Sequence, residues 1–347
     1  ILACVDRVFS NGVFVGASAI VGFETAIAEY CGVQHAVGVG SGTDALFLSM
    51  IALGIGAGDE VITPPNSHFS STSSIIHAGA IPVFADVGPD QNFDLAAVEA
   101  AITPNTAAIM PVHLTGRIAD MDGILRIADK FDLKVIEDSA QAIGADMNGK
   151  KAGSFGDIAA FSAHPLKNLN AAGDAGFITT NDTALADRIT LLRNNGLEGR
   201  ETVLEWGYAS RMDVLQAEIL AMRLPKLEGI IQRRRKNAEI YMASLDKRYV
   251  FWPASRSAEM SVYHNFVIQV DDRDSLKKYL FEHGVQSAIH YLVPIHLQPA
   301  AKYLGYKKGD FKRTEEQAKQ ILTLPVNESL SSNQIKFICN KINKFFK

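Results

Sequence analysis

Hydrophobic positions in roughly the first two-thirds of the chain alternate between two spacings. Segments with apolar residues at helical spacing, such as Thr43–Leu53 and Met121–Phe131, lie between short apolar runs of strand length. Strands separated by helices of this length predict parallel βαβ units with helices on both faces. The predicted strands are His35–Gly40, Asp59–Thr63, Ile81–Ala85, Ala107–Pro111 and Lys134–Glu137, and further helices are Phe23–Cys31 and the segment from the Pro64-Pro65 turn to about His77.

The pattern changes near residue 230. A charged helix is predicted from about Leu227 to Leu245, and it is followed by an alternating strand, a helix, a short strand, a loop rich in Pro and His, and a last helix. We therefore expect two domains, a large α/β domain over 1–230 and a smaller α+β domain over 231–347. The later elements are predicted at Val262–Val270, Arg273–His283, Ser287–His290 and Ser332–Phe346.

Charge and composition exclude several classes of partner. The 347 residues carry a formal net charge of −4, which gives no general attraction to nucleic acid or to an anionic membrane. No apolar run reaches the roughly 18 residues that a membrane helix needs. Cys4, Cys31 and Cys339 lie far apart without metal-ligand spacing, so we expect neither a disulfide framework nor a metal site. A reducing, cytoplasmic location follows.

Polar residues that follow the predicted strands are the candidates for chemistry, because α/β sheets bind ligands at the carboxyl ends of their strands. The first such segment, Gly38 to Asp44, consists of small residues that end a strand and open a helix. Its backbone N–H groups, at the positive end of a helix dipole, would suit a phosphate. A tight strand-to-helix turn without a ligand would use the same residues.

The second candidate is Asp138, directly after a buried apolar strand. A carboxylate in that position is costly unless a cation meets it. The alternative is a helix N-cap, with Asp138 as the cap and Gln141 completing a capping box.

The third candidate is Lys167, in a loop of small residues after the apolar run Ala159–Phe161. A lysine in a half-buried pocket has a lowered pKa and can form an imine. The alternative is an ordinary surface charge.

The three candidates together match the needs of one cofactor. Pyridoxal phosphate requires an anion site for its phosphate, a carboxylate facing its pyridinium nitrogen, and a lysine that holds its aldehyde as a Schiff base. The carboxylate keeps the ring nitrogen protonated, so that the ring can serve as an electron sink.

At these residues the chain resembles the DegT/DnrJ/EryC1/StrS family, sugar aminotransferases with the type I fold of pyridoxal-phosphate enzymes. The resemblance runs in order over nearly the whole chain. It implies a large, doubly wound, mostly parallel sheet domain and a smaller C-terminal α+β domain. The matching stretches are Gly12–Phe23, Gly38–Leu46, Val61–Val87, Pro111–Asp122, Glu137–Gly144, Gly153–Gly176, Gly207–Gln216, Tyr263–His264 and Gly284–Gln298.

The resemblance implies a role for each matching residue. Lys167 lies in a Ser-x-His-Pro-x-Lys-Asn motif and is implied to be the imine-forming lysine. Asp138 is the implied partner of the pyridine nitrogen, and Gln141 the residue near the ring hydroxyl. The implied phosphate ligands are Gly42, Thr43 and Ser162. His68 stands at the position that stacks on the ring, and a shift of one residue would give that role to Phe69.

A further motif implies a homodimer with shared active sites. Arg211 and Gln216 lie in a segment that in the family reaches the neighbouring subunit's site. The asparagine that usually donates to the phosphate across the dimer is Ala209 here, so that hydrogen bond should be absent or replaced by Ser210.

The resemblance therefore implies an aminotransferase that moves an amino group from glutamate to a nucleotide-activated 3-keto or 4-keto deoxyhexose. His290, Tyr291 and His296 lie in the loop that approaches the sugar nucleotide in the family. One alternative keeps the cofactor and changes the substrate to a cyclitol or a sugar phosphate. Another is a regulatory homologue that binds pyridoxal phosphate without turnover.

Overall fold

The computed structural model describes residues 1–16 and 18–347 and is built on a seven-stranded sheet. The strand order is β1-β9-β8-β5-β4-β2-β3, and the pairs β2–β3, β2–β4, β4–β5 and β5–β8 are parallel. The predicted mostly parallel sheet is confirmed. The strands are β1 (His35–Val39), β2 (Glu60–Thr63), β3 (Ile81–Phe84), β4 (Thr106–Ile109), β5 (Lys134–Asp138), β8 (Ile158–Ser162) and β9 (Gly176–Thr180).

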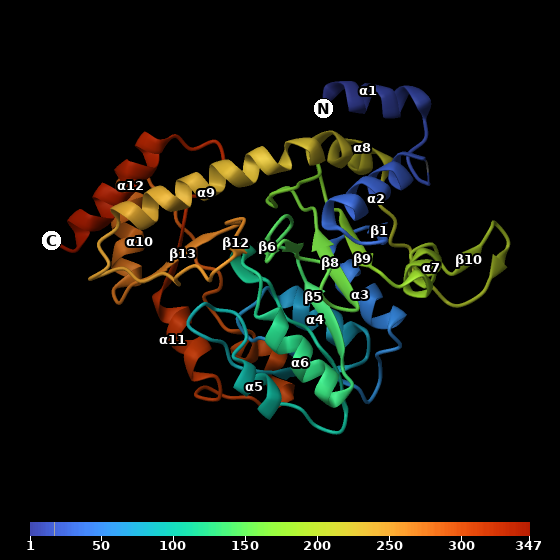
Figure 1. Ribbon diagram of the computed structural model, residues 1–347, viewed down its shortest axis with the longest axis horizontal. Coiled ribbons are helices and arrows are strands. Elements are labelled where there is room, and N and C mark those ends of the chain that lie inside the picture. Colours follow the sequence, from blue (N-terminus) through green and yellow to red (C-terminus); the bar gives the residue numbers. More distant parts are fainter. Residues whose placement is uncertain (17) are drawn as a thin grey trace.

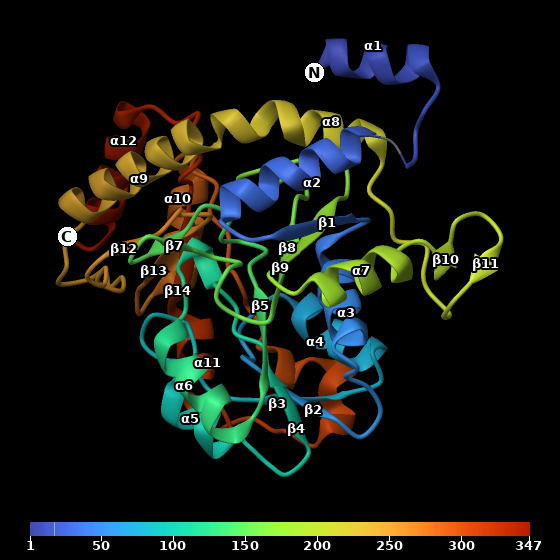
Figure 2. The same cartoon turned by 45° about the vertical axis from the view of Figure 1, so that its right-hand side comes forward.

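Side chains from each central strand enter two separate cores, because successive residues of a strand point to opposite faces. On β5, Val135 belongs to one core and Ile136 to the other. Figure 2 shows the sheet between the helices that supply these cores. One core receives α2 (Ser18–Cys31), α5 (Leu95–Ala100), α6 (Met121–Phe131) and α8 (Val214–Arg223), and the other receives α3 (Gly42–Ala52), α4 (Phe69–His77) and α7 (Thr183–Leu192).

The C-terminal part has a core of its own around a two-stranded antiparallel sheet. The long helix α9 crosses the predicted boundary near residue 230 (Figure 1), and this boundary stays a prediction. The elements are α9 (Leu227–Ser244), β13 (Phe266–Gln269), α10 (Arg273–Glu282), α11 (Lys312–Gln320), β14 (Ile321–Leu324) and α12 (Ser332–Phe345).

Two strand predictions for the C-terminal part are wrong, one of them partly and the other entirely. The predicted strand Val262–Val270 is extended only from Phe266, because Tyr263 has a positive φ of 43° that breaks the pleat. Ser287–His290 is not a strand, and its pairing is a single bridge between Ala288 and Thr323.

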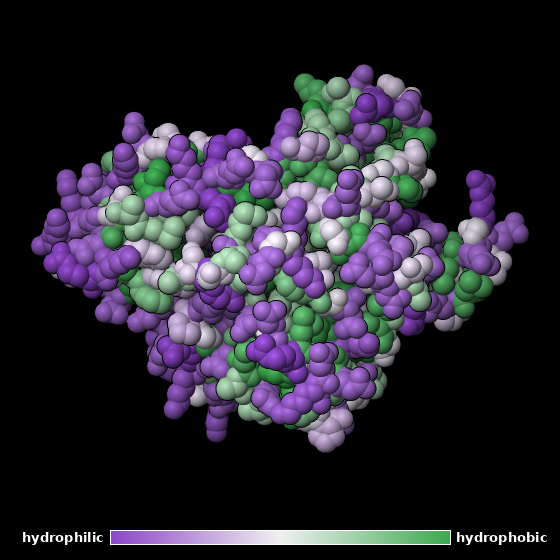
Figure 3. Space-filling model, viewed as in Figure 1, coloured by the Kyte–Doolittle hydropathy of each residue, from purple (hydrophilic) through white to green (hydrophobic). Residues whose placement is uncertain are grey.

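Two elements stand away from the body of the molecule in Figures 1 and 2: α1 (Leu2–Asn11) and the hairpin of β10 (Leu197–Glu198) and β11 (Thr202–Val203). Both carry exposed apolar side chains, including Phe9 on α1 and Trp206, which follows the hairpin. Figure 3 shows apolar surface over both elements. None of the helices in the described part of the chain is long and apolar enough to cross a membrane.

The remaining elements are short. A three-stranded sheet contains β6 (Asp146–Met147), β7 (Lys150–Lys151) and β12 (Glu259–Met260), so that it joins the C-terminal part to the large sheet domain. Short 3-10 helices lie at Leu114–Gly116, Leu224–Lys226, Ile295–Leu297 and Pro299–Leu304.

One edge of the large sheet collects the carboxyl ends of β1, β2, β4, β5 and β8. The strand β9 runs against both of its neighbours, so its first residue, Gly176, lies at this same edge. Most loops that carry candidate residues therefore meet in one place.

Candidate active site

The segment Ser41–Thr43 opens α3 next to the end of β8. Ser41 caps the helix by accepting a hydrogen bond from the Asp44 N–H at 3.1 Å. Gly42 lies so close to β8 that a β-carbon there would be 2.6 Å from Cβ of Ser162. Only glycine fits this contact, which places the first N–H groups of α3 beside the Ser162 hydroxyl. This arrangement suits an anion.

The helix α4 begins beside the N-terminus of α3. The Thr43 hydroxyl donates to Oγ of Ser70, in the first turn of α4, at 2.9 Å. Gly42, Thr43, Ser70 and Ser162 line one cavity of about 550 Å³, which also contains Lys167 and is called the Lys167 cavity below. The implied phosphate ligands Gly42, Thr43 and Ser162 are thus brought together, with Ser70 of α4 as a further hydroxyl beside them.

Asp138 is buried at the end of β5 and lines the same cavity. Its Oδ2 accepts a hydrogen bond from the Ser71 hydroxyl at 2.8 Å, and its Oδ1 accepts one from the Ala140 N–H at 3.2 Å. The segment 139–145 forms turns instead of a helix. The alternative interpretation of Asp138 and Gln141 as a helix capping box is therefore wrong.

Lys167 is half-buried in a loop that follows β8, within the cavity. Burial lowers the pKa of Lys167, and the nearby carboxylate of Asp138 offsets part of this effect. Asn168 anchors the loop by donating to the Val262 carbonyl at 3.1 Å, and Gln216 accepts a hydrogen bond from the Ala172 N–H at 2.8 Å. The ammonium thus shares a cavity with a buried carboxylate, unlike an ordinary surface charge.

Four histidines line the cavity around this lysine, and the pKa of three of them is lowered. Burial, together with the charge of Lys167, lowers the pKa of His68 and of His290. Burial lowers the pKa of His264 well below its usual value, and the charges of Lys167 and Arg234 add to this effect. The imidazoles of His68, His264 and His290 are therefore neutral near pH 7, so they can donate or accept a hydrogen bond without adding positive charge.

Gln141 and Tyr291 close another side of the cavity. The Gln141 side chain accepts a hydrogen bond from the Thr115 N–H at 2.8 Å and donates to the Tyr291 hydroxyl at 3.4 Å. Burial, followed by the charge of Asp138, raises the pKa of Tyr291 to about 12. The phenol therefore stays protonated and can donate a hydrogen bond.

His68 and Phe69 both line the cavity. The ring of His68 caps α4 by accepting from the Ser70 N–H at 3.2 Å, and its centroid lies 3.9 Å from that of Phe69. The stacking role of His68, or of Phe69 after a shift of one residue, stays a prediction.

Two predicted residues lie outside the Lys167 cavity. His296 is buried, lies 3.2 Å from the Glu315 carboxylate and packs edge-on against Phe311. Arg211 is exposed and donates to the Asn194 side chain at 3.1 Å. Within one subunit, neither side chain reaches the cavity that contains Lys167.

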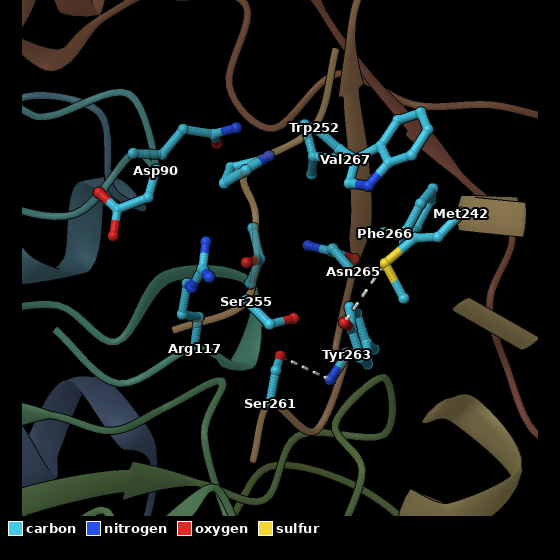
Figure 4. A pocket seen from close by; sticks show the side chains of 13 residues that line it. Asp90, Arg117, Met242, Trp252, Ser255, Ser261, Tyr263, Asn265, Phe266 and Val267 are labelled. Atoms are coloured by element: carbon cyan, nitrogen blue, oxygen red, sulfur yellow. Dashed lines mark hydrogen bonds between the residues drawn. The ribbon is translucent and has the colours of Figure 1, made fainter. Parts of the chain in front are cut away.

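Sequence reasoning gave no role to His264 and Asn265, which also line the cavity. They are positioned by a strap, defined here as residues 254–265. Figure 4 shows a second, small cavity that is lined by Arg117 and by the strap residues Ser255, Ser261, Tyr263 and Asn265. Arg117 forms an ion pair of 2.5 Å with Glu259, and the Val262 N–H donates to the Gly116 carbonyl at 2.9 Å. The order of residues gave no signal for this long-range contact.

The strap and the loop that supports Gln141 form one unit. The Thr115 N–H holds Gln141, and the Thr115 carbonyl accepts from the Asn265 N–H at 3.2 Å. A β-carbon at Gly116 would lie 2.9 Å from the backbone nitrogen of His264, so the two segments are in close contact. Two walls of the Lys167 cavity are therefore fixed to one another.

The structure is thus that of an α/β protein with a lysine and a carboxylate in one cavity at the edge of its large sheet. The chain belongs to the DegT/DnrJ/EryC1/StrS aminotransferase family, whose model matches residues 1–343. The predicted family, enzyme class and fold are confirmed.

Similar proteins include aminotransferases with known crystal structures. The chain is 40% identical to the dTDP-3-amino-3,6-dideoxy-alpha-D-galactopyranose transaminase of Aneurinibacillus thermoaerophilus, over 98% of this chain and 93% of that one. It matches S. venezuelae DesV in complex with a ketimine intermediate with a TM-score of 0.97 and 38% identity, covering 99% and 93% of the two chains. It matches ntda of Bacillus subtilis with bound cofactor PMP with a TM-score of 0.90 and 32% identity, covering 99% and 81%.

Proposed function

We propose that this protein is a pyridoxal-phosphate-dependent aminotransferase that transfers an amino group from glutamate to the keto-sugar of a sugar nucleotide. The observation that carries the proposal is the meeting of Lys167, Asp138 and the anion cradle of Gly42, Thr43 and Ser162 in one cavity. The similar transaminase acts, by its name, on a dTDP-linked 3-amino sugar, and a similar structure holds the cofactor in its amino form.

The described residues fit the cofactor. The cradle offers N–H groups and a hydroxyl for its phosphate, and Asp138 offers a buried carboxylate whose two oxygens each accept a single hydrogen bond. When bound, pyridoxal phosphate supplies an electron sink next to the carbon that loses or gains the amino group. Asp138 would hold a proton on the ring nitrogen, and Gln141 would lie near the ring hydroxyl.

Lys167 has two tasks in this proposal. Its lowered pKa increases the share of neutral amine, which is the form that attacks an aldehyde. When it is not linked to the cofactor, Nζ of Lys167 would stay in the cavity, where it could take up and release a proton as a general acid and base. Asp138, as the negative charge nearby, stabilises the positive charge that Lys167 takes up.

His290 and Tyr291 are the proposed sugar contacts. Nδ1 of His290 is 2.9 Å from the Thr323 hydroxyl, which leaves Nε2 for the substrate. His296 is not proposed as a sugar contact, because its ring lies outside the Lys167 cavity and contacts the Glu315 carboxylate in the C-terminal part.

The functional unit is proposed to be a homodimer in the cytoplasm. The exposed apolar residues of α1 and of the segment after β11, including Trp206, would be covered by a second copy. Arg211, exposed and outside its own cavity, would then serve the partner's site. The three cysteines are free and buried, which suits a reducing compartment.

Ser210 is an unsuitable replacement for a cross-subunit phosphate donor. Its hydroxyl accepts from the Gly40 N–H at 3.1 Å and donates to the Asp44 carboxylate at 2.7 Å. It is thus engaged within its own subunit, where it supports the anion cradle.

The test is the first half-reaction. Purified enzyme loaded with pyridoxal phosphate and mixed with glutamate should lose the absorbance of the lysine-bound cofactor and release one 2-oxoglutarate per site. A keto-sugar nucleotide should then restore that absorbance. No spectral change with glutamate or with any other amino acid would contradict the proposal.

A further inference from the structure

A wide groove runs from the Lys167 cavity across the C-terminal part. Leu166, His264, Asn265 and His290 line both the cavity and the groove, so the two spaces are continuous. The groove has a volume of about 1000 Å³, at the upper end of the usual range for small-molecule sites. It is called the α10 groove below, because the side of α10 forms one wall. A keto-sugar at Lys167 would thus have room to extend in this direction.

One face of α10 gives this wall its chemistry. Asp274, Lys277, Lys278 and Phe281 are spaced three and four residues apart, so they share a helix face, and all four line the groove. Phe281 is 70% exposed, which is unusual for a phenylalanine on a monomeric surface and leaves its ring free for contact. Gln286 and Pro325 lie farther along the same groove.

The two lysines are the available cations of the groove. Within residues 1–16 and 18–347, neither Lys277 nor Lys278 takes part in an ion pair or a side-chain hydrogen bond. Asp274, the acid beside them, forms its ion pair with Arg273 at 2.6 Å. Arg234 also lines the groove, but its guanidinium is engaged by Glu328 at 3.1 Å and by two backbone carbonyls.

We propose that the α10 groove binds the nucleoside diphosphate of the substrate, with Lys277 and Lys278 on the phosphates and Phe281 against the base. This inference rests on the proposed function. Lysine binds phosphate as a point charge, and a base stacks on an exposed aromatic ring. The groove lies beyond His290, the proposed sugar contact, so that sugar, phosphates and base would follow one path outward from Lys167.

The double variant Lys277→Ala/Lys278→Ala tests the phosphate contacts. The matched control is Lys307→Ala/Lys308→Ala, an exposed lysine pair away from the groove. Titration calorimetry of the pyridoxal-phosphate-loaded enzyme with UDP, dTDP and inorganic pyrophosphate should show binding weakened about 10-fold or more in the first variant only. Phe281→Ala should weaken UDP and dTDP roughly 5-fold and leave pyrophosphate unchanged.

Kinetics separate this inference from the proposed function. In the groove variant, KM for the keto-sugar nucleotide should rise about 10-fold or more, while the half-reaction with glutamate keeps its rate. Unchanged nucleotide affinity and unchanged KM in the groove variant would overturn the α10 groove alone. Equal losses in the control variant would also overturn it. Failure of the wild-type enzyme to react with glutamate would contradict the proposed function, and the calorimetry would still decide the groove.

Discussion

Two neighbouring carboxylates at the end of β5 have opposite surroundings. Glu137 and Asp138 are both buried, but successive residues of a strand face opposite sides. The Glu137 carboxylate is 2.9 Å from His113 Nε2 and accepts hydrogen bonds from the N–H groups of Gly153, Phe155 and Gly156. Asp138 has one hydroxyl and one N–H donor and otherwise faces the Lys167 cavity.

This difference indicates that Glu137 stabilises the fold, whereas Asp138 is available to a ligand in the cavity. A carboxylate has about four acceptor positions, and Glu137 uses three of them to hold the loop before β8 and the fourth for His113. Burial by itself would raise the pKa of Glu137, but the His113 contact and the backbone donors lower it on balance. Asp138 keeps free acceptor capacity at the cavity, where a cationic group can be placed.

The largest effect is expected from Lys167→Ala, in the cavity that Asp138 faces. Removal of the amine should lower turnover about 10⁴-fold or more, since both the imine link and the proton carrier are lost. The absorbance of the lysine-bound cofactor should disappear, while equilibrium dialysis still detects pyridoxal phosphate held by the cradle. Borohydride reduction of the wild-type enzyme followed by peptide mapping should label Lys167; a label on another lysine would refute its assignment.

Asp138→Asn should lower turnover roughly 10²- to 10³-fold, because an amide supplies no negative charge to a ring nitrogen. The hydrogen bonds with Ser71 and Ala140 can persist with an amide, so the free energy of unfolding should change by less than about 1 kcal/mol. Steady-state kinetics and urea unfolding on the same sample measure both quantities. Near-normal turnover of Asp138→Asn would show that the negative charge of Asp138 is not needed for the reaction.

Glu137→Gln should show the opposite behaviour. The amide NH₂ would face N–H donors, so the free energy of unfolding should fall by about 3 kcal/mol, while the remaining folded enzyme keeps near-normal turnover. Urea unfolding and activity per bound cofactor provide the two readings. A large loss of turnover without a loss of stability would show that the two acids are not separable.

The same variant should alter the pH dependence of stability. The pKa of Glu137 is lower in the folded state than its ordinary value of 4.5, so its contribution is complete above about pH 4.5 and is lost as the pH falls through the folded pKa. Glu137→Gln should therefore flatten the decline of unfolding free energy as the pH falls below about 4.5. An identical decline in both proteins would assign acid sensitivity to other groups.

Ser71→Ala should have the smallest effect. It removes one neutral donor, at 2.8 Å, from Asp138, and about 1 kcal/mol corresponds to a roughly five-fold loss of turnover. Ser73→Ala is a matched control on α4, since its hydroxyl contacts only the backbone of its own helix. Equal kinetics of the two variants would show that Ser71 does not tune Asp138.

Much of this contrast could be predicted from the sequence. The buried apolar strand that ends in two acids placed Asp138 at the ligand-binding edge, and the small residues around Gly42 and Lys167 indicated close packing there. The sequence could not say that Glu137 is satisfied by donors from 153–156 and His113, because those contacts depend on how distant loops fold back.

Other features could not be predicted for similar reasons. No strand is predicted at β9, and its fully buried run Gly176–Thr180 carries no signal that it runs antiparallel to its neighbours. The Pro/His-rich loop contains both His290 and His296, and only packing against Phe311 and Glu315 decides that His296 lies away from the cavity. The positive φ of Tyr263 that ends a predicted strand is likewise a tertiary effect.

The strap of residues 254–265 has a consequence for the order in which the enzyme is made. Chains emerge from the ribosome N-terminus first, and domains tend to fold as they appear. The anion cradle, Asp138 and Lys167 are all synthesised before Arg117 has met Glu259, and His290 and Tyr291 come later still. A nascent chain can thus complete its large sheet with two walls of the cavity still missing, and only a polypeptide that extends past Tyr291 can enclose its cofactor.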